Sequence, residues 1–157
     1  MKKEYVPYNK LNIDKDAPDA LERLREAEQM YREFIKNDPD KINYKSDLCM
    51  VLGIMGYIYK ESDPDTALVY LDEAETIADE LYEKTKHPDV RHSTAMLKVF
   101  KGLAKMKRND ADFFSCFEES VAILAELEQQ YPDNEKYWKT HFWIRTCTIG
   151  IKNKYNL

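Results

Sequence analysis

The 157-residue sequence contains little glycine and proline, with four and six residues respectively. Both residue types mark tight turns, so their scarcity argues against a fold of many short strands. No stretch approaches the roughly 18 consecutive apolar residues of a membrane-spanning helix, and the N-terminal residues lack the apolar core of a signal peptide. We therefore expect a domain with no membrane partner.

Cysteine is also scarce, and its three copies (Cys49, Cys116 and Cys147) are widely separated among apolar neighbours. This pattern is typical of reduced thiols that act as small core side chains, so we expect a cytoplasmic location. Acidic residues outnumber basic ones by 29 to 24, which gives a formal charge of −5. Such a balance provides no general surface for nucleic acid, and we expect no nucleic-acid partner.

The chain lacks the motifs of metal sites and of common active sites. His87 and His92 are five residues apart, a spacing that does not place two imidazoles on one helical face. No paired Cys-x2-Cys and no glycine-rich phosphate loop is present, and a cysteine nucleophile would need a histidine brought close by the fold. The sequence therefore predicts no metal, no cofactor and no enzymatic activity.

What the sequence does contain is six runs with apolar residues at steps of three and four, the spacing of one helical face. These runs cover residues 18–37, 43–60, 64–85, 90–107, 111–130 and 134–151. Ser62 or Asp63 is positioned to cap the third run, and Asn109 or Asp110 to cap the fifth. We predict an all-α fold in which residues 17–157 form one helical domain after an N-terminal extension, residues 1–16.

Three of the runs repeat one pattern of small and apolar residues, separated by 47 and then 46 positions. The aligned sets are Ala20, Leu24 and Ala27, then Ala67, Leu71 and Ala74, then Phe113, Phe117 and Ser120. Each copy is followed by a Pro-Asp pair, at positions 39, 88 and 132. Small residues allow helices to approach closely, so we expect Ala27 and Ala74 to lie at helix contacts.

This pattern resembles the tetratricopeptide repeat family. The Ala-x3-Leu-x2-Ala core and the closing proline match that family's second helix, and Met55-Gly56-x2-Tyr59 resembles the Leu-Gly-x2-Tyr of its first helix. The period is longer than the family's usual value of about 34 residues. The resemblance implies a short right-handed α-solenoid of about three antiparallel helical hairpins, whose concave face binds a peptide or a protein segment.

The helices that would line this concave face are residues 43–60, 90–107 and 134–151. The middle one carries a basic stripe at steps of three and four: Lys98, Lys101, Lys105 and Arg108. One interpretation is a solvated face, and the other is a binding site for an acidic peptide or a carboxylate terminus. We select the four residues of the stripe as candidate partner contacts, together with Tyr57 and Arg145 on the other two lining helices.

The last helix carries two apolar faces, one with Trp138 and Phe142 and the other with Trp143. A terminal helix of a solenoid is expected to turn a polar face outward, so these residues are candidates for self-association as a homodimer or for contact with a partner. The alternative is that Tyr5, Val6 and Tyr8 of the N-terminal extension cover them.

The sequence thus predicts a non-catalytic scaffold or adaptor that binds a protein or peptide. Two alternatives stay open at this point. One is a structural subunit that self-associates through its last helix, and the other is a regulatory domain that senses a peptide.

Overall fold

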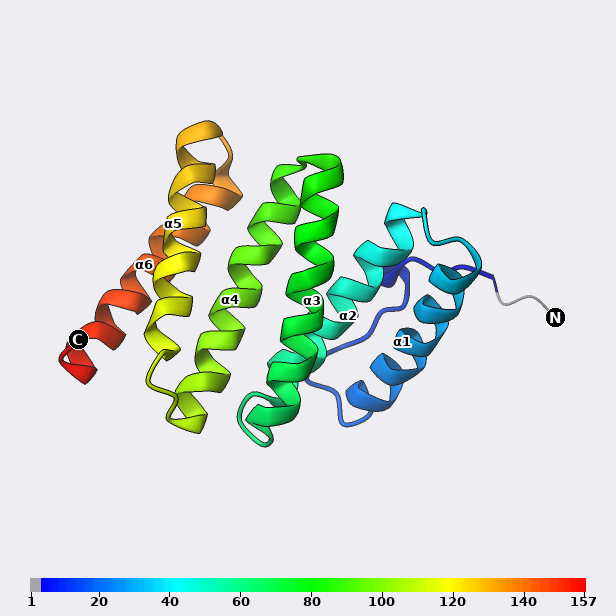
Figure 1. Ribbon diagram of the computed structural model, residues 1–157, viewed down its shortest axis with the longest axis horizontal. Helices are drawn as coiled ribbons and strands as arrows, with labels where there is room; N and C mark the ends of the chain where they lie inside the picture. Colours follow the sequence, from blue (N-terminus) through cyan, green and yellow to red (C-terminus); the bar gives the residue numbers. More distant parts are fainter. Residues whose placement is uncertain (1–3) are drawn as a thin grey trace.

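The computed structural model describes residues 4–157, and this part of the chain is helical with no strand. A short 3-10 helix, η1 (Tyr8–Lys10), is followed by α1 (Ala20–Asn37), α2 (Ile42–Tyr59), α3 (Pro64–Thr85), α4 (Pro88–Arg108), α5 (Phe113–Gln130) and α6 (Glu135–Tyr155). Figure 1 shows these helices following one another in chain order along the longest axis. The predicted all-α class is confirmed. None of the described helices combines the length and apolarity that crossing a bilayer requires.

The helix boundaries follow from capping chemistry. The side chain of Asp63 accepts a hydrogen bond from the Thr66 amide at the start of α3, as predicted. Helix α4 begins two residues before the predicted start, because Pro88 needs no hydrogen-bond partner in a first turn. The predicted cap of α5 is wrong: Asn109 instead ends α4 in the left-handed conformation, with φ of 62°.

Each helix packs mainly against its neighbours in the chain, and the apolar interior falls into two clusters. The first joins α1, α2 and α3 to part of α4, and the second joins α4, α5 and α6. Ala27 and Ala74 are both buried in the first cluster, as the repeat pattern predicts. Cys49 and Cys116 are buried as well, whereas Cys147 is exposed, so the prediction that all three thiols lie in the core is wrong for Cys147.

The repeat in the sequence is also a repeat in space. A Cβ atom at Gly56 of α2 would lie 2.4 Å from Cγ of Leu71 of α3, and a Cβ atom at Gly102 of α4 would lie 2.9 Å from the Phe117 ring of α5. The two glycines are 46 residues apart, and so are Leu71 and Phe117. The pairs α2–α3 and α4–α5 therefore approach each other through equivalent positions.

A hydrogen bond recurs between the same two pairs of helices, but it runs in opposite directions. The Cys49 thiol of α2 donates to the carbonyl of Ala74 of α3 at 3.3 Å. At the equivalent positions, the Ser120 hydroxyl of α5 donates to the carbonyl of Ala95 of α4 at 2.8 Å. In each pair, a small polar side chain of one helix thus donates to a backbone carbonyl of the other helix.

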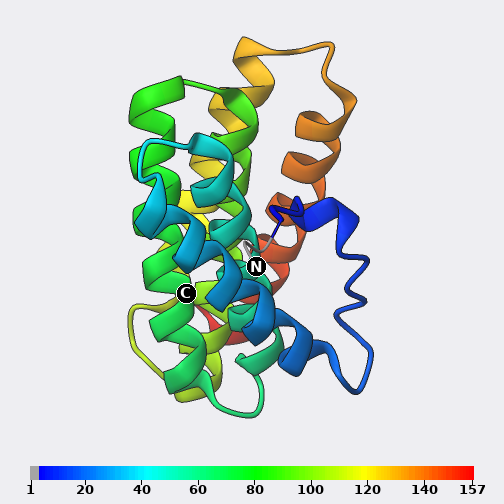
Figure 2. The same ribbon diagram turned by 90° about the vertical axis from the view of Figure 1, so that its right-hand side faces the viewer.

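The N-terminal segment, residues 4–19, packs on α1 and α2 rather than on α6. The Tyr5 ring contacts Phe34 and Tyr44, and its hydroxyl donates to Asp47. The Tyr31 hydroxyl donates to the Val6 carbonyl at 2.9 Å. Figure 2 shows this segment beside the first helices. The alternative in which Tyr5, Val6 and Tyr8 cover the last helix is therefore wrong, because this segment packs instead against aromatic side chains of α1 and α2.

We expect Gly56→Ala to lower the free energy of unfolding by about 1–2 kcal/mol, because overpacking against Leu71 outweighs the better helix propensity of alanine. Gly150→Ala is the matched control, since a Cβ atom there meets nothing within 4 Å. That change should raise the unfolding free energy by up to about 1 kcal/mol. Urea denaturation measures both, and a stabilising Gly56→Ala would contradict the close contact.

Candidate binding surfaces

An apolar pocket of about 340 Å³ lies between α2, α4 and the second half of α3. Its walls repeat the same positions on two helices, because Ser46, Met50 and Ile54 of α2 are each 46 residues before their counterparts on α4. Those counterparts are His92, Met96 and Phe100. Ala78 and Leu81 of α3 also line the pocket. The volume is within the range of small ligand sites, and it suits one or two apolar side chains.

The polar groups at this pocket are few and neutral. Burial, aided by the charge of Lys136, lowers the pKa of His92 below its ordinary value of 6.5, so the imidazole is uncharged at pH 7. Its Nε2 atom lies 3.1 Å from the Thr140 hydroxyl of α6. The arrangement therefore favours an apolar occupant over a charged one.

Tyr57, selected from the sequence, lies next to this pocket. Its ring centroid is 5.0 Å from that of Phe100, which lines the pocket, and the Lys60 ammonium lies 3.7 Å from the centroid of the Tyr57 ring. Met50 and Met96 were not selected from the sequence. The signal that identifies them is their equivalent position on two successive lining helices, combined with the 47% exposure of Met50.

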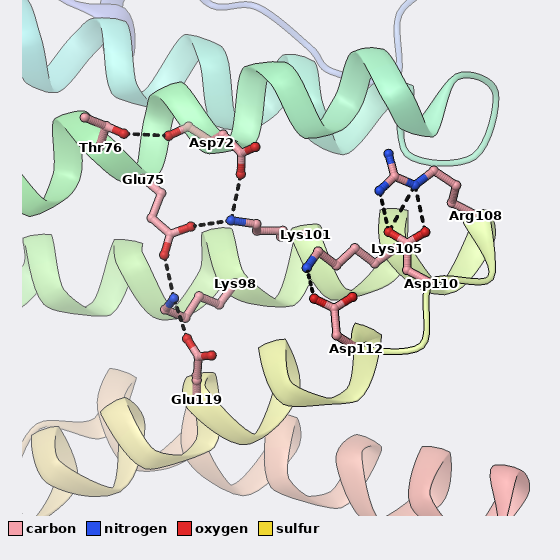
Figure 3. Close-up of polar contacts among 10 residues, drawn as sticks. All are labelled: Asp72, Glu75, Thr76, Lys98, Lys101, Lys105, Arg108, Asp110, Asp112 and Glu119. Carbon is pink, nitrogen blue, oxygen red and sulfur yellow. Dashed lines mark hydrogen bonds and ion pairs between the residues drawn. The ribbon is translucent and has the colours of Figure 1, made fainter.

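The basic stripe on α4 faces away from the pocket and is paired with acids of this chain (Figure 3). Lys98 lies 2.5 Å from Glu75 of α3 and 2.6 Å from Glu119 of α5. Lys101 lies 2.6 Å from Asp72 and 3.0 Å from Glu75. The stripe thus joins α3, α4 and α5 in one network.

The other two members of the stripe are paired as well. Lys105 lies 2.5 Å from Asp112, and Arg108 contacts Asp110 at 2.5 Å and Asp65 at 2.8 Å. The interpretation of the stripe as a merely solvated face is therefore wrong, because all four cations are paired with acids of α3, of α5 or of the loop that joins α4 to α5. The same pairing neutralises the charge that an acidic peptide would need, so we do not place the binding site there.

Glu75 is the centre of this network, and its side chain is only 16% exposed. Burial alone raises the pKa of Glu75, but hydrogen bonds from Lys98 and Lys101 and the charges of these lysines outweigh it. The net result is a pKa below the ordinary value of 4.5. Despite their burial, the pKa of Lys98 is raised by its hydrogen bonds to Glu119 and Glu75, and the pKa of Lys101 by its hydrogen bonds to Asp72 and Glu75. The network is therefore fully charged at neutral pH.

The remaining predicted residues lie on α6. Arg145 is exposed and borders a groove between α5 and α6, away from the apolar pocket. Trp138, Phe142 and Trp143 are 41%, 62% and 62% exposed. The core-facing side of α6 instead carries Tyr137, Ile144 and Thr148, which are buried. Within residues 4–157, no cluster of three or more His, Cys, Asp or Glu side chains is arranged to hold a metal ion.

No family model, curated protein or solved structure matches this chain. Its family and function are therefore proposed from its own residues and their arrangement.

We expect Glu75→Gln to lower the free energy of unfolding at pH 7 by about 1–3 kcal/mol, because two largely buried lysines lose the charged acceptor that they share and each keeps only one other acid. A folded-state pKa below 4.5 means that the carboxylate stabilises the fold above this value and less so as the pH falls through the folded pKa. The difference between variant and wild type should therefore shrink below about pH 4.5.

The matched control is Glu83→Gln on the same helix. Glu83 pairs with Lys86, but both side chains are well exposed, at 75% and 60%. Exposed pairs contribute little, so this variant should unfold like the wild type at every pH. An equal loss of stability in the two variants, measured by urea denaturation, would contradict the role given to Glu75.

Proposed function

We propose that this protein is a non-catalytic scaffold that binds a peptide or protein segment through an apolar side chain seated between α2 and α4. In this proposal the helices form a short solenoid similar to tetratricopeptide repeats, in which α2, α4 and α6 line the concave side. The tetratricopeptide-like spacing of residues 20–27, 67–74 and 113–120 supports this arrangement.

The single observation that carries the proposal is the repeated wall of the pocket. Met50 and Met96 occupy equivalent positions on two successive helices, and both border the same apolar space. Methionine is flexible and polarisable, so a pair of methionines adapts to different apolar side chains. Stacked repeats use such equivalent positions to build one continuous binding surface.

The N-terminal segment of the chain supports an extended occupant. Tyr5, Pro7 and Tyr8 border a second space along α2, and two of the residues that face them, Ser46 and Met50, also line the apolar pocket. The two spaces are therefore neighbours on one face of α2. An extended segment bound in the pocket would continue the path that the N-terminal segment already follows.

A phage-displayed library of random linear peptides tests this function. We expect selected peptides to share an apolar residue and to lose binding by about tenfold or more when Met50→Glu and Met96→Glu are combined, because both charges would be buried by the peptide. Val69→Glu is the matched control, since Val69 is 67% exposed on α3 and lines none of the described pockets.

Circular dichroism of each variant verifies that the fold is retained. Peptides that bind the Met50→Glu, Met96→Glu variant as tightly as the wild type would refute the pocket as the binding site. Failure of the library to yield any peptide specific for the wild type would refute the peptide-binding function.

A further inference from the structure

Helices α4 and α6 correspond when they are aligned with an offset of 47 residues. Leu97, Lys101 and Ala104 of α4 face the preceding helices, as the contact of Leu97 with Gly53 and the pairing of Lys101 with α3 show. Their counterparts on α6 are Ile144, Thr148 and Ile151, and two of these three are buried. Helix α6 therefore packs on the preceding helices through the side that is equivalent to the one that Leu97, Lys101 and Ala104 form on α4.

A second side of α4 is covered by the helix that follows it. Four residues of α4 contact α5 or its N-cap residue there: Ala95 with Ser120, Lys98 with Glu119, Gly102 with Phe117, and Lys105 with Asp112. The counterparts on α6 are Phe142, Arg145, Ile149 and Lys152. No described helix covers them, and Phe142 and Ile149 are 62% and 52% exposed. We call these four residues the α6 outer face.

The charges of the two helices show what would fit this face. On α4, Lys98 is paired with Glu119 of α5 and Lys105 with Asp112, the N-cap residue of α5, seven residues before Glu119. The counterparts of these two lysines on the α6 outer face are also cations, Arg145 and Lys152, and they are again seven residues apart. Helix α6 as a whole carries five lysine or arginine residues and one acid, although the chain has a net charge of −5.

A groove of about 310 Å³ runs beside the α6 outer face. Arg145, Ile149 and Lys152 border it from α6, and Val121 and Ala125 border it from α5, together with other residues that include Glu118. The groove is therefore mostly apolar, with the two cations Arg145 and Lys152 on its α6 side and mainly apolar side chains on its α5 side. A helix that lies over α6 would rest its apolar side in this groove.

We propose that the α6 outer face binds an amphipathic helix of another protein, one that carries acidic residues seven positions apart beside an apolar stripe. This helix would take the place over α6 that α5 takes over α4. A second copy of this chain fits less well, because pairing two α6 helices would bring together two strongly basic faces. The proposal is independent of the apolar pocket between α2 and α4.

A peptide derived from α5 serves as the probe. It contains residues 110–131 with Phe117→Ala, because Ile149 occupies the place of Gly102 on α6, and with Cys116→Ser to prevent oxidation. Both tryptophans of the chain, Trp138 and Trp143, lie on α6 and are exposed. We expect the peptide to shift their fluorescence to shorter wavelength and to bind more weakly as salt rises.

The charge requirement is tested by exchange. Arg145→Glu combined with Lys152→Glu should weaken peptide binding by about tenfold or more. A peptide in which Asp112→Lys and Glu119→Lys are introduced should regain binding to that variant. Lys36→Glu combined with Lys84→Glu changes the net charge equally on other helices, α1 and α3, and should leave binding unchanged.

Several results would overturn the proposal. One is equal binding of the probe peptide to the wild type and to the Arg145→Glu, Lys152→Glu variant. Another is a tryptophan shift that depends on the concentration of the protein alone, with a dimer in sedimentation, which would assign the face to a second copy. A shift with anionic phospholipid vesicles but not with the peptide would assign it to a membrane surface.

Discussion

The close approach of α2 to α3 at Gly56, repeated between α4 and α5 at Gly102, is the contact on which the rest of the structure depends. The helix that carries the glycine has no room for a side chain at this point, because a large side chain of its partner helix occupies the space. This contact fixes the tilt and the register of the pair. Leu71 and Phe117 then fill equivalent places opposite the glycines. Because the contact recurs with a period of 46 residues, it generates equivalent surfaces on successive helices. Both the apolar pocket and the α6 outer face are consequences of that repetition.

Much of this fold is predictable from the sequence, because helix periodicity and small residues are local signals. The spacing of Ala67, Leu71 and Ala74 identifies the buried side of α3, and all three side chains are indeed fully buried. The caps are less predictable. Asn109 is equally suited to begin a helix or to end one, and only the left-handed backbone at the end of α4 decides between these roles.

The candidate site was harder to predict, because it depends on contacts between helices. Along α4 alone, Lys98 and Lys101 form a basic stripe with no acid on the same side. Two of the acids that neutralise them, Asp72 and Glu75, lie on α3, and helix packing sets the positions of these acids relative to α4. A half-buried ion-pair network of this kind joins helices together, and its charge is then not free to attract a partner. The charge pattern of one helix therefore does not show whether its cations are free until the facing helices are known.

The two ends of the molecule differ in how they are closed. Residues 4–19 hold down α1 and α2 through Tyr5 and Tyr31, whereas α6 packs mainly against α5 on one side. In a linear array of helices, a terminal helix with an uncovered side opens more readily than one that is covered, so we expect the amide hydrogens of α6 to exchange with solvent before those of the inner helices. A partner helix bound over α6, as proposed above, would stabilise the ordered state of α6, so its affinity would be coupled to the order of the last helix.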